Sequence, residues 1–136
     1  NAVEYYSKFS LGTYANKSSV DKLISSSNKY KISTIVKYWS KKFGLDPYLV
    51  YAVIMAESSG NPYCATKSSA GGYGIMQCER AAYFNKKQTI KFLDGSTKSF
   101  TPSLSTMKPG GTTTLNGVKV NKGISNQIMF GCHELR

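Results

Sequence analysis

The sequence is poor in the residues that form disulfide frameworks and metal sites. It contains three cysteines and one histidine among 136 residues. No Cys-x-x-Cys pair occurs, so the spacing matches no standard zinc pattern. An odd number of cysteines leaves at least one unpaired, and we expect buried or partly exposed free thiols and synthesis in a reducing cytosol. A zinc site is left as an alternative, built from Cys64, Cys78, Cys132 and His133.

Long apolar runs are also missing. No segment approaches the roughly 20 apolar residues of a membrane-spanning helix, so no membrane span is expected. The chain opens on Asn-Ala-Val-Glu, without the charged and apolar segments of a secretory signal peptide. Because it starts on Asn1 and stops on Arg136, we expect it to be a fragment of a longer polypeptide.

Acidic residues are scarce. Lysine and arginine total 18 against 7 acids, which gives a formal charge of +11. Such a chain is attracted to polyanions: nucleic acid, acidic membranes or the anionic polymers of a bacterial wall. Only Arg80 and Arg136 are arginines, and the lysines are spread through Ser- and Thr-rich segments. Since no recognition helix or aromatic RNA-binding motif appears, specific nucleic-acid binding is not expected.

Apolar residues recur at helical spacing in several segments. They predict an amphipathic helix over residues 32–43, stopped by Gly44, and a last helix over residues 124–135. Shorter helices are predicted over residues 18–24 and 79–84. Asp46 and Pro47 are typical of a helix start. The helix that they open is apolar on every face over residues 49–56, so we expect it to be a buried central helix.

Two dipeptides indicate β-hairpins. Asp94-Gly95 joins residues 89–93 to 96–100, and Asn116-Gly117 joins residues 112–115 to 118–120. A loop rich in proline and glycine separates the two hairpins. The layout predicts one α+β domain over residues 1–136, mainly helical, with a helical N-terminal part (1–43) and a β-rich insert (85–122).

Glu57 is the leading catalytic candidate. A carboxylate at the end of an apolar helix is poorly solvated, which raises its pKa and suits a general acid near neutral pH. An ordinary helix-terminal acid is the simpler interpretation. Two features favour a cleft instead: the sharp turn over residues 58–62, and three glycines within residues 71–74 that allow a ligand close to the backbone.

These segments resemble a known family. Residues 57–62 (Glu-Ser-Ser-Gly-Asn-Pro), Ser68 and residues 71–77 (Gly-Gly-Tyr-Gly-Ile-Met-Gln) resemble the soluble-type lytic transglycosylases, the SLT domain of the lysozyme-like superfamily. Ile75 stands where leucine is usual. The resemblance covers residues 45–136, including the Asn126-Gln127-Ile128 segment and Gly131. A later tyrosine motif of the family is expected beyond Arg136.

The resemblance implies a lysozyme-like fold and an enzyme that cleaves the β-1,4 bond between N-acetylmuramic acid and N-acetylglucosamine. Glu57 would protonate the glycosidic oxygen and then deprotonate the C6 hydroxyl, giving a 1,6-anhydro product. Ser68 would hydrogen-bond the catalytic acid. Gln77 and the backbone near Met76 would contact sugar, while Tyr73 would stack on a sugar ring or simply pack. No metal or cofactor is implied.

Two alternatives stay open. A hydrolytic muramidase normally uses two carboxylates, and Glu79 and Asp94 are the acids considered for the second. A non-catalytic module could instead hold anionic wall polymers through its lysines. The expected partners are peptidoglycan glycan strands and anionic wall polymers. The expected setting is the bacterial cell wall, as a phage endolysin, a tail-associated lysin or a secreted domain.

Overall fold

The computed structural model of the chain describes residue 18, residues 21–23 and residues 29–136. Residue 18 and residues 21–23 are helical, in the segment where a short helix is predicted over residues 18–24. The other residues of that helix, and most of the N-terminal part expected over residues 1–43, lie outside the described residues.

Two consecutive helices form one side of the molecule. α4 (Ile32–Phe43) buries the predicted apolar stripe and ends before Gly44. α5 (Pro47–Ser58) begins where the sequence indicates, because the Asp46 side chain accepts a hydrogen bond from the Tyr48 N–H at 2.9 Å. Residues 49–54 of α5 are all buried, and its last four residues are half-buried. The open last turn is the first sign of a cleft beside this helix.

Three short hairpins follow α5. β1 (Gly72–Tyr73) pairs with β2 (Cys78–Glu79), which leads into the four-residue helix α6 (Arg80–Tyr83). β3 (Gln88–Lys91) pairs with β4 (Thr97–Phe100), and β5 (Thr112–Leu115) pairs with β6 (Val118–Asn121), all antiparallel. The Asp94-Gly95 and Asn116-Gly117 hairpins are therefore confirmed. Between them lies α7 (Leu104–Met107), a capped helical turn where the sequence predicted only a loop.

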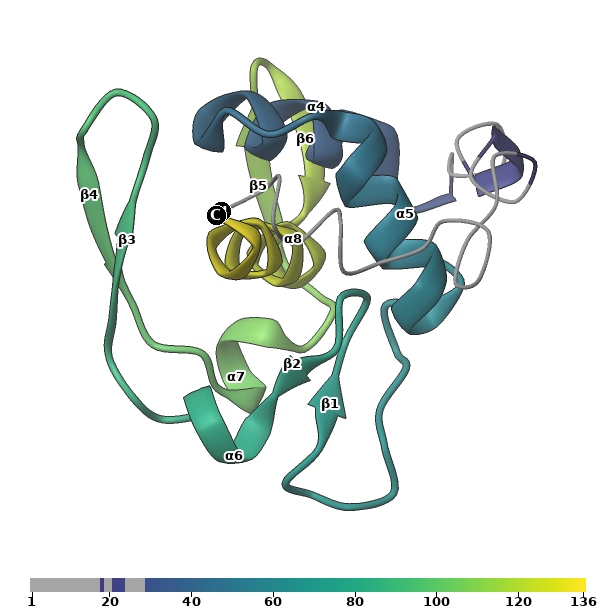
Figure 1. Cartoon of the computed structure of the whole chain (residues 1–136), viewed down its shortest axis with the longest axis vertical. Helices are drawn as coiled ribbons and strands as arrows, with labels where there is room; N and C mark the ends of the chain where they lie inside the picture. The colour runs from purple at the N-terminus through teal and green to yellow at the C-terminus, as the bar shows by residue number, and fades with distance from the viewer. Residues whose placement is uncertain (1–17, 19–20, 24–28) are drawn as a thin grey trace.

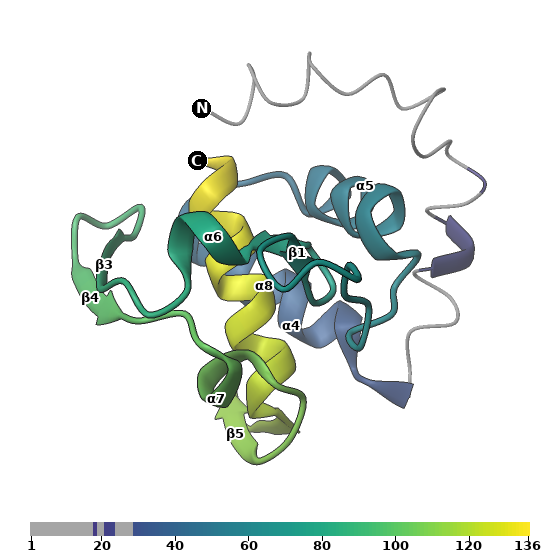
Figure 2. The ribbon, with the colours of Figure 1, turned by 90° about the horizontal axis from the view of Figure 1, so that it is seen from below.

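The last helix, α8 (Lys122–Leu135), runs through the middle of the fold. It lies between α4, α7 and the hairpins in both views (Figures 1 and 2). The Trp39 indole N–H on α4 donates to the Ser125 hydroxyl on α8 at 3.0 Å, a buried bond between the two helices. The Trp39 ring also stacks on Phe92 just after β3, with 6.1 Å between centroids. The hairpin β3–β4 is thus anchored to α4 next to its turn, where the Leu93 N–H also donates to the Lys42 carbonyl at 2.8 Å.

The predicted class, α+β and mainly helical, is confirmed, and residues 85–122 hold the β3–β4 and β5–β6 hairpins. None of the helices in the described ranges is long and apolar enough to cross a membrane.

Gly123 allows α8 to approach the loop after α7. A Cβ atom at this position would lie 1.8 Å from the carbonyl oxygen of Lys108 and 2.9 Å from the Cα of Pro109. Both neighbours are backbone atoms, so relieving the clash requires the chain itself to move. Any larger side chain at residue 123 therefore separates α8 from the loop that packs on its first turn.

We predict that Gly123→Ala lowers the free energy of unfolding by a net ~1–2 kcal/mol. Alanine gains about 1 kcal/mol of helix propensity over glycine, but overpacking costs typically 1–3 kcal/mol and more against backbone. Lys122→Ala, at the exposed neighbouring position, is the control and should be nearly neutral. Chemical denaturation measures both variants, and a stabilised Gly123→Ala would contradict the close approach.

Candidate active site

Glu57 lies in the last turn of α5 and is half-buried. Burial raises the pKa of its carboxyl, and the negative charge of Glu79 raises it further. Among the described residues no donor group hydrogen-bonds the Glu57 carboxylate. Because nothing there neutralises or satisfies the charge, the protonated form is favoured, as the sequence predicts for a general acid.

Ser58 ties the end of α5 to the glycine-rich segment. Its hydroxyl donates to the Ile75 carbonyl at 2.6 Å and lies 3.1 Å from the Ile54 carbonyl. The Gly60 N–H donates back to the same hydroxyl at 3.2 Å. The two residues of the Glu-Ser pair therefore differ in role. Ser58 holds the turn through hydrogen bonds, whereas no described residue donates one to the Glu57 carboxylate.

Residues 74–77 form the tight turn between β1 and β2. Gln77 has a φ of 52°, in the left-handed region, and its side-chain amide donates to the Gly74 carbonyl at 2.7 Å and the Cys64 carbonyl at 2.9 Å. Both amide hydrogens therefore hold the local backbone. Substrate binding by Gln77 stays a prediction, and its amide oxygen is the group left for it.

Gln127 on α8 is a buried clamp that the sequence did not assign. Its amide oxygen accepts from the Ile75 N–H at 2.6 Å. Its amide nitrogen donates to the Met107 carbonyl at 2.7 Å and to the Pro62 carbonyl at 3.1 Å. One side chain thereby joins the turn after α5, the β1–β2 turn and the end of α7.

Arg80 holds the loop before β1. Its guanidinium donates to the carbonyls of Gly71 at 2.9 Å, Ser68 at 2.6 Å and Thr66 at 3.1 Å. The Ser68 hydroxyl is exposed and accepts from the Ala70 N–H at 3.3 Å, a local turn contact. The structure does not bring Ser68 into hydrogen-bond contact with Glu57, so its predicted role at the catalytic acid stays untested.

Tyr73 and Met76 pack on opposite sides of the turn. The Tyr73 ring lies 5.5 Å from Phe84 and 5.6 Å from the Arg80 guanidinium, measured to ring centroids, so it is part of the loop packing. Met76 is 9 % exposed and lies against α8 at Gly131. A Cβ at Gly131 would come within 2.3 Å of the Met76 sulfur, which explains why a glycine suits this position of the helix.

A recess of about 120 Å³ lies beside the Glu57 helix. Val53, one turn before Glu57, forms its wall on α5, and Met76 forms the wall on the β1–β2 turn. The recess is also lined by Tyr83 of α6 and by three residues of α8: Gly131, Glu134 and Leu135. Residues of α5, α6, α8 and the β1–β2 turn therefore line this space together.

Glu134 is the acid that sequence reasoning missed. The residue as a whole is exposed, yet partial burial of its carboxyl and the negative charges of Glu79 and then Glu57 raise its pKa to about 7. Helical spacing places it one turn after Gly131, on the face that meets Met76. That spacing was visible in the sequence, but nothing there indicated that this face of α8 meets the end of α5.

Glu79 and Asp94, the two candidates for a second carboxylate, lie in different surroundings. Glu79 is exposed at the end of β2, and its charge acts on Glu57. Asp94 sits in the β3–β4 turn, where its carboxylate accepts from the Ser96 hydroxyl and from the Ser96 N–H, and these two hydrogen bonds lower its pKa. Asp94 is therefore a turn residue, and the acids near Glu57 are Glu79 and Glu134.

The predicted free thiols are confirmed. Cys64 is half-buried, and Cys78 and Cys132 are buried, without disulfides. Burial raises the pKa of Cys78 to about 12, with Glu134 and Glu79 contributing, so this thiol stays protonated. In the part of the chain that the structure describes, no group of three or more His, Cys, Asp or Glu side chains could hold a metal ion.

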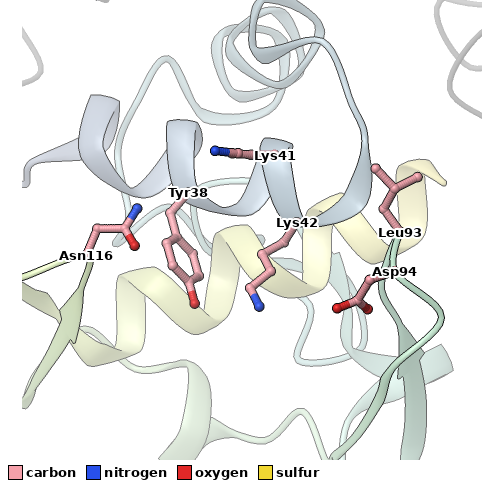
Figure 3. A pocket seen from close by; sticks show the side chains of 6 residues that line it. All are labelled: Tyr38, Lys41, Lys42, Leu93, Asp94 and Asn116. Carbon is pink, nitrogen blue, oxygen red and sulfur yellow. The ribbon is translucent and has the colours of Figure 1, made fainter.

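A larger recess, of about 380 Å³, lies away from Glu57. Tyr38, Lys41 and Lys42 of α4 line it, together with Leu93 and Asp94 of the β3–β4 turn and Asn116 of the β5–β6 turn (Figure 3). It holds none of the predicted site residues. We place the candidate chemistry near the smaller recess because Glu134 borders it and Glu57 follows one helical turn after Val53, which also borders it.

A comparison with protein families matches residues 34–124 to the transglycosylase SLT domain. No match to the chain is found among curated proteins or among solved structures. The matched residues cover most of the chain and include Glu57, Ser68 and the β1–β2 turn, and the chain therefore belongs to the transglycosylase SLT domain family. The match ends before Gln127 and Glu134.

Membership of this family indicates the class of reaction and where it takes place. The SLT family consists of lytic transglycosylases that cleave peptidoglycan, and it acts at the cell wall. The lysozyme-like fold inferred from the sequence motifs is confirmed with it.

We predict that Gln127→Leu destabilises the protein by about 3 kcal/mol. The substitution leaves one buried N–H and two carbonyls without their partner, at about 1–3 kcal/mol for each group that water cannot reach. Asn126→Ala is the matched control, since Asn126 makes one half-buried bond to the Thr106 carbonyl and should cost about 1 kcal/mol. Thermal or denaturant unfolding measures both. An equal loss of unfolding free energy in the two variants would contradict the role of Gln127 in holding the three segments together.

Proposed function

We propose that this chain cleaves the glycan strands of peptidoglycan at the bond between N-acetylmuramic acid and N-acetylglucosamine, with Glu57 as the catalytic acid. The observation that carries the proposal is the half-buried Glu57 carboxyl at the end of α5, inside the matched family segment, to which no described residue donates a hydrogen bond. Burial raises the pKa of this carboxyl and so favours its protonated form, which is the form that protonates a leaving glycosidic oxygen.

The finer proposal is non-hydrolytic cleavage. Glu57 protonates the glycosidic oxygen, the bond to C1 breaks, and Glu57 as a carboxylate then accepts the proton of the C6 hydroxyl. That oxygen bonds to C1 and gives the 1,6-anhydro product. A hydrolytic muramidase remains the nearest alternative, because Glu79 and Glu134 supply further carboxyls near Glu57.

Ser68, Tyr73, Met76 and Gln77 are the proposed substrate-binding residues. Met76 is the one that borders the recess beside α5. Gln77 bonds the Gly74 carbonyl within the β1–β2 turn, and the Arg80 guanidinium lies near the Tyr73 ring and bonds the Gly71 carbonyl of the preceding loop. Sugar contacts at these residues would therefore run along the turn rather than into the protein.

Glu57→Gln should lower cleavage of purified peptidoglycan by about 10²–10⁴-fold, since the amide cannot donate a catalytic proton. The decrease in turbidity of a wall suspension measures the rate. Asp94→Asn is the control, because this acid is exposed in a hairpin turn and lies outside the recess. Undiminished clearing by Glu57→Gln, with Asp94→Asn also active, would refute the role of Glu57.

A second proposal concerns anionic wall polymers. Two adjoining recesses of about 360 and 350 Å³ share Gly111 and flank the β5–β6 hairpin. The residues that line them include no acid. Five exposed lysines surround them, and we name this surface the lysine face: Lys29, Lys31, Lys108, Lys119 and Lys122. Its charge suits a phosphodiester polymer of the wall.

Replacing Lys108, Lys119 and Lys122 by serine should weaken binding to a soluble glycerol-phosphate polymer by about tenfold at low salt. That estimate takes about 0.5 kcal/mol for each exposed ion pair. The control replaces Lys87, Lys91 and Lys98 by serine, which removes the same charge outside the lysine face. Equal weakening of both variants in a binding titration would mean that only net charge matters.

A further inference from the structure

The larger recess, between α4 and the turns of two hairpins, is a cavity that cleavage at Glu57 leaves unexplained. Its volume of about 380 Å³ lies in the range of about 300–1,000 Å³ that is typical of small-ligand sites. α4, the β3–β4 turn and the β5–β6 turn each contribute side chains to its lining (Figure 3). The proposed catalytic and substrate-binding residues are not among the residues that line it.

Contacts between the surrounding elements hold this recess in shape. The hydrogen bond from the Leu93 N–H to the Lys42 carbonyl fixes the β3–β4 turn on the end of α4. The Tyr38 ring packs edge-on against Trp39, with 4.7 Å between the ring centroids. The Leu93 side chain is 61 % exposed although its backbone is held, so it offers an apolar contact to a ligand. A recess that is already formed needs little reorganisation when a ligand binds.

Lys42 brings a positive charge to the aromatic side of the recess. Its ammonium lies 5.9 Å from the centroid of the Tyr38 ring and 5.5 Å from that of the Phe92 ring. Tyr38 and Lys42 extend to the same side of α4 (Figure 3). Among the described residues, none accepts a hydrogen bond from this ammonium or forms an ion pair with it. Its donors are therefore available to a ligand, and a carboxylate is an acceptor that pairs strongly with them.

Asn116 and Asp94 differ in what they offer to a ligand. The Asn116 amide points toward Tyr38 from the β5–β6 turn, and no described residue hydrogen-bonds it (Figure 3). An amide both donates and accepts, so it matches a peptide group. The Asp94 carboxylate accepts the hydroxyl and the N–H of Ser96 and is held in its own turn. Its charge disfavours a ligand that is negative along its whole length.

We propose that this recess binds the C-terminal end of a short peptide. The terminal carboxylate pairs with Lys42, the last peptide group bonds the Asn116 amide, and a small apolar side chain contacts Leu93. A phosphate polymer fits less well, because it has no apolar groups for Leu93 and the rings and is repelled by Asp94. The stem peptides of peptidoglycan have the required chemistry: they are short, contain alanine and end in a carboxylate. This choice of peptide rests on the proposed function, and the recess would hold the protein on the wall while Glu57 acts elsewhere.

The test compares two synthetic peptides that differ at one group. The first is L-Ala-D-isoGlu-L-Lys-D-Ala with a free C-terminal carboxylate, and the second is the same peptide with a C-terminal amide. NMR titration of the full ¹⁵N-labelled chain follows the signals of Leu93 and Asn116. We expect both signals to shift, and the free carboxylate to bind about fivefold more tightly than the amide, since one exposed ion pair is lost.

A charge variant tests the assignment of Lys42. Lys42→Gln should bind the two peptides about equally, because the partner of the terminal carboxylate is gone. Lys98→Gln is the matched control: it removes the same charge from an exposed position on β4 outside the recess, and it should keep the preference for the free carboxylate. Both peptides are measured on each variant, so the ratio of their affinities does not depend on a change in stability.

Three results would overturn the proposal. They are equal binding of the two peptides by the parent chain, shifts confined to the smaller recess and residues 74–77, and displacement of the peptide from Leu93 and Asn116 by a soluble glycerol-phosphate polymer. Peptide binding does not require cleavage. If the peptide binds as expected while Glu57→Gln still clears wall suspensions, the proposed function fails and the recess stands. If Glu57→Gln abolishes clearing but the peptide does not bind, only the recess assignment fails.

Discussion

The buried amide of Gln127 is the interaction on which the rest of the site depends. It accepts from the Ile75 N–H and donates to the Met107 and Pro62 carbonyls, so one side chain of α8 holds three segments that are separate in the sequence. Ser58 then ties the end of α5 to the same Ile75 residue through its carbonyl. The position of Glu57 is therefore set by a chain of short hydrogen bonds that begins in the middle of the fold.

The same arrangement gives the site its electrostatic character. The main donors of the surrounding turns bond the local backbone: Arg80 donates to the loop carbonyls, and the Gln77 amide nitrogen donates to the Gly74 and Cys64 carbonyls. Among the described residues, none donates such a bond to the Glu57 carboxylate, which lies close to an apolar recess and to two further acids. In a chain of net charge +11, this local excess of negative charge is unusual, and it favours both a retained proton and a cationic transition state.

Local chemistry made much of this structure predictable. Asp46-Pro47, Asp94-Gly95 and Asn116-Gly117 each act within a few residues, and the helix start and both hairpins occur where they indicate. The motif around Glu57 was equally readable, and the family match includes it.

The features that the sequence did not predict are those that depend on tertiary packing. α7 is a single turn stabilised by the Ser103–Thr106 capping box, within a loop whose prolines and glycines suggest no helix. Strands β1 and β2 have two residues each, too short for an alternating pattern. Glu134 and the Gln127 clamp depend on how α8 meets α5 and the turns, which are far away in the sequence. No local pattern carries that information.

Mass spectrometry of the fragments released from purified peptidoglycan tests the central claim most directly. If Glu57 acts as acid and then as base, the products carry terminal 1,6-anhydro-N-acetylmuramic acid, and Glu57→Gln releases none of them. Fragments that end in ordinary reducing N-acetylmuramic acid would contradict the non-hydrolytic reaction and identify a muramidase. Release of the same fragments by Glu57→Gln would contradict the assignment of this carboxyl altogether.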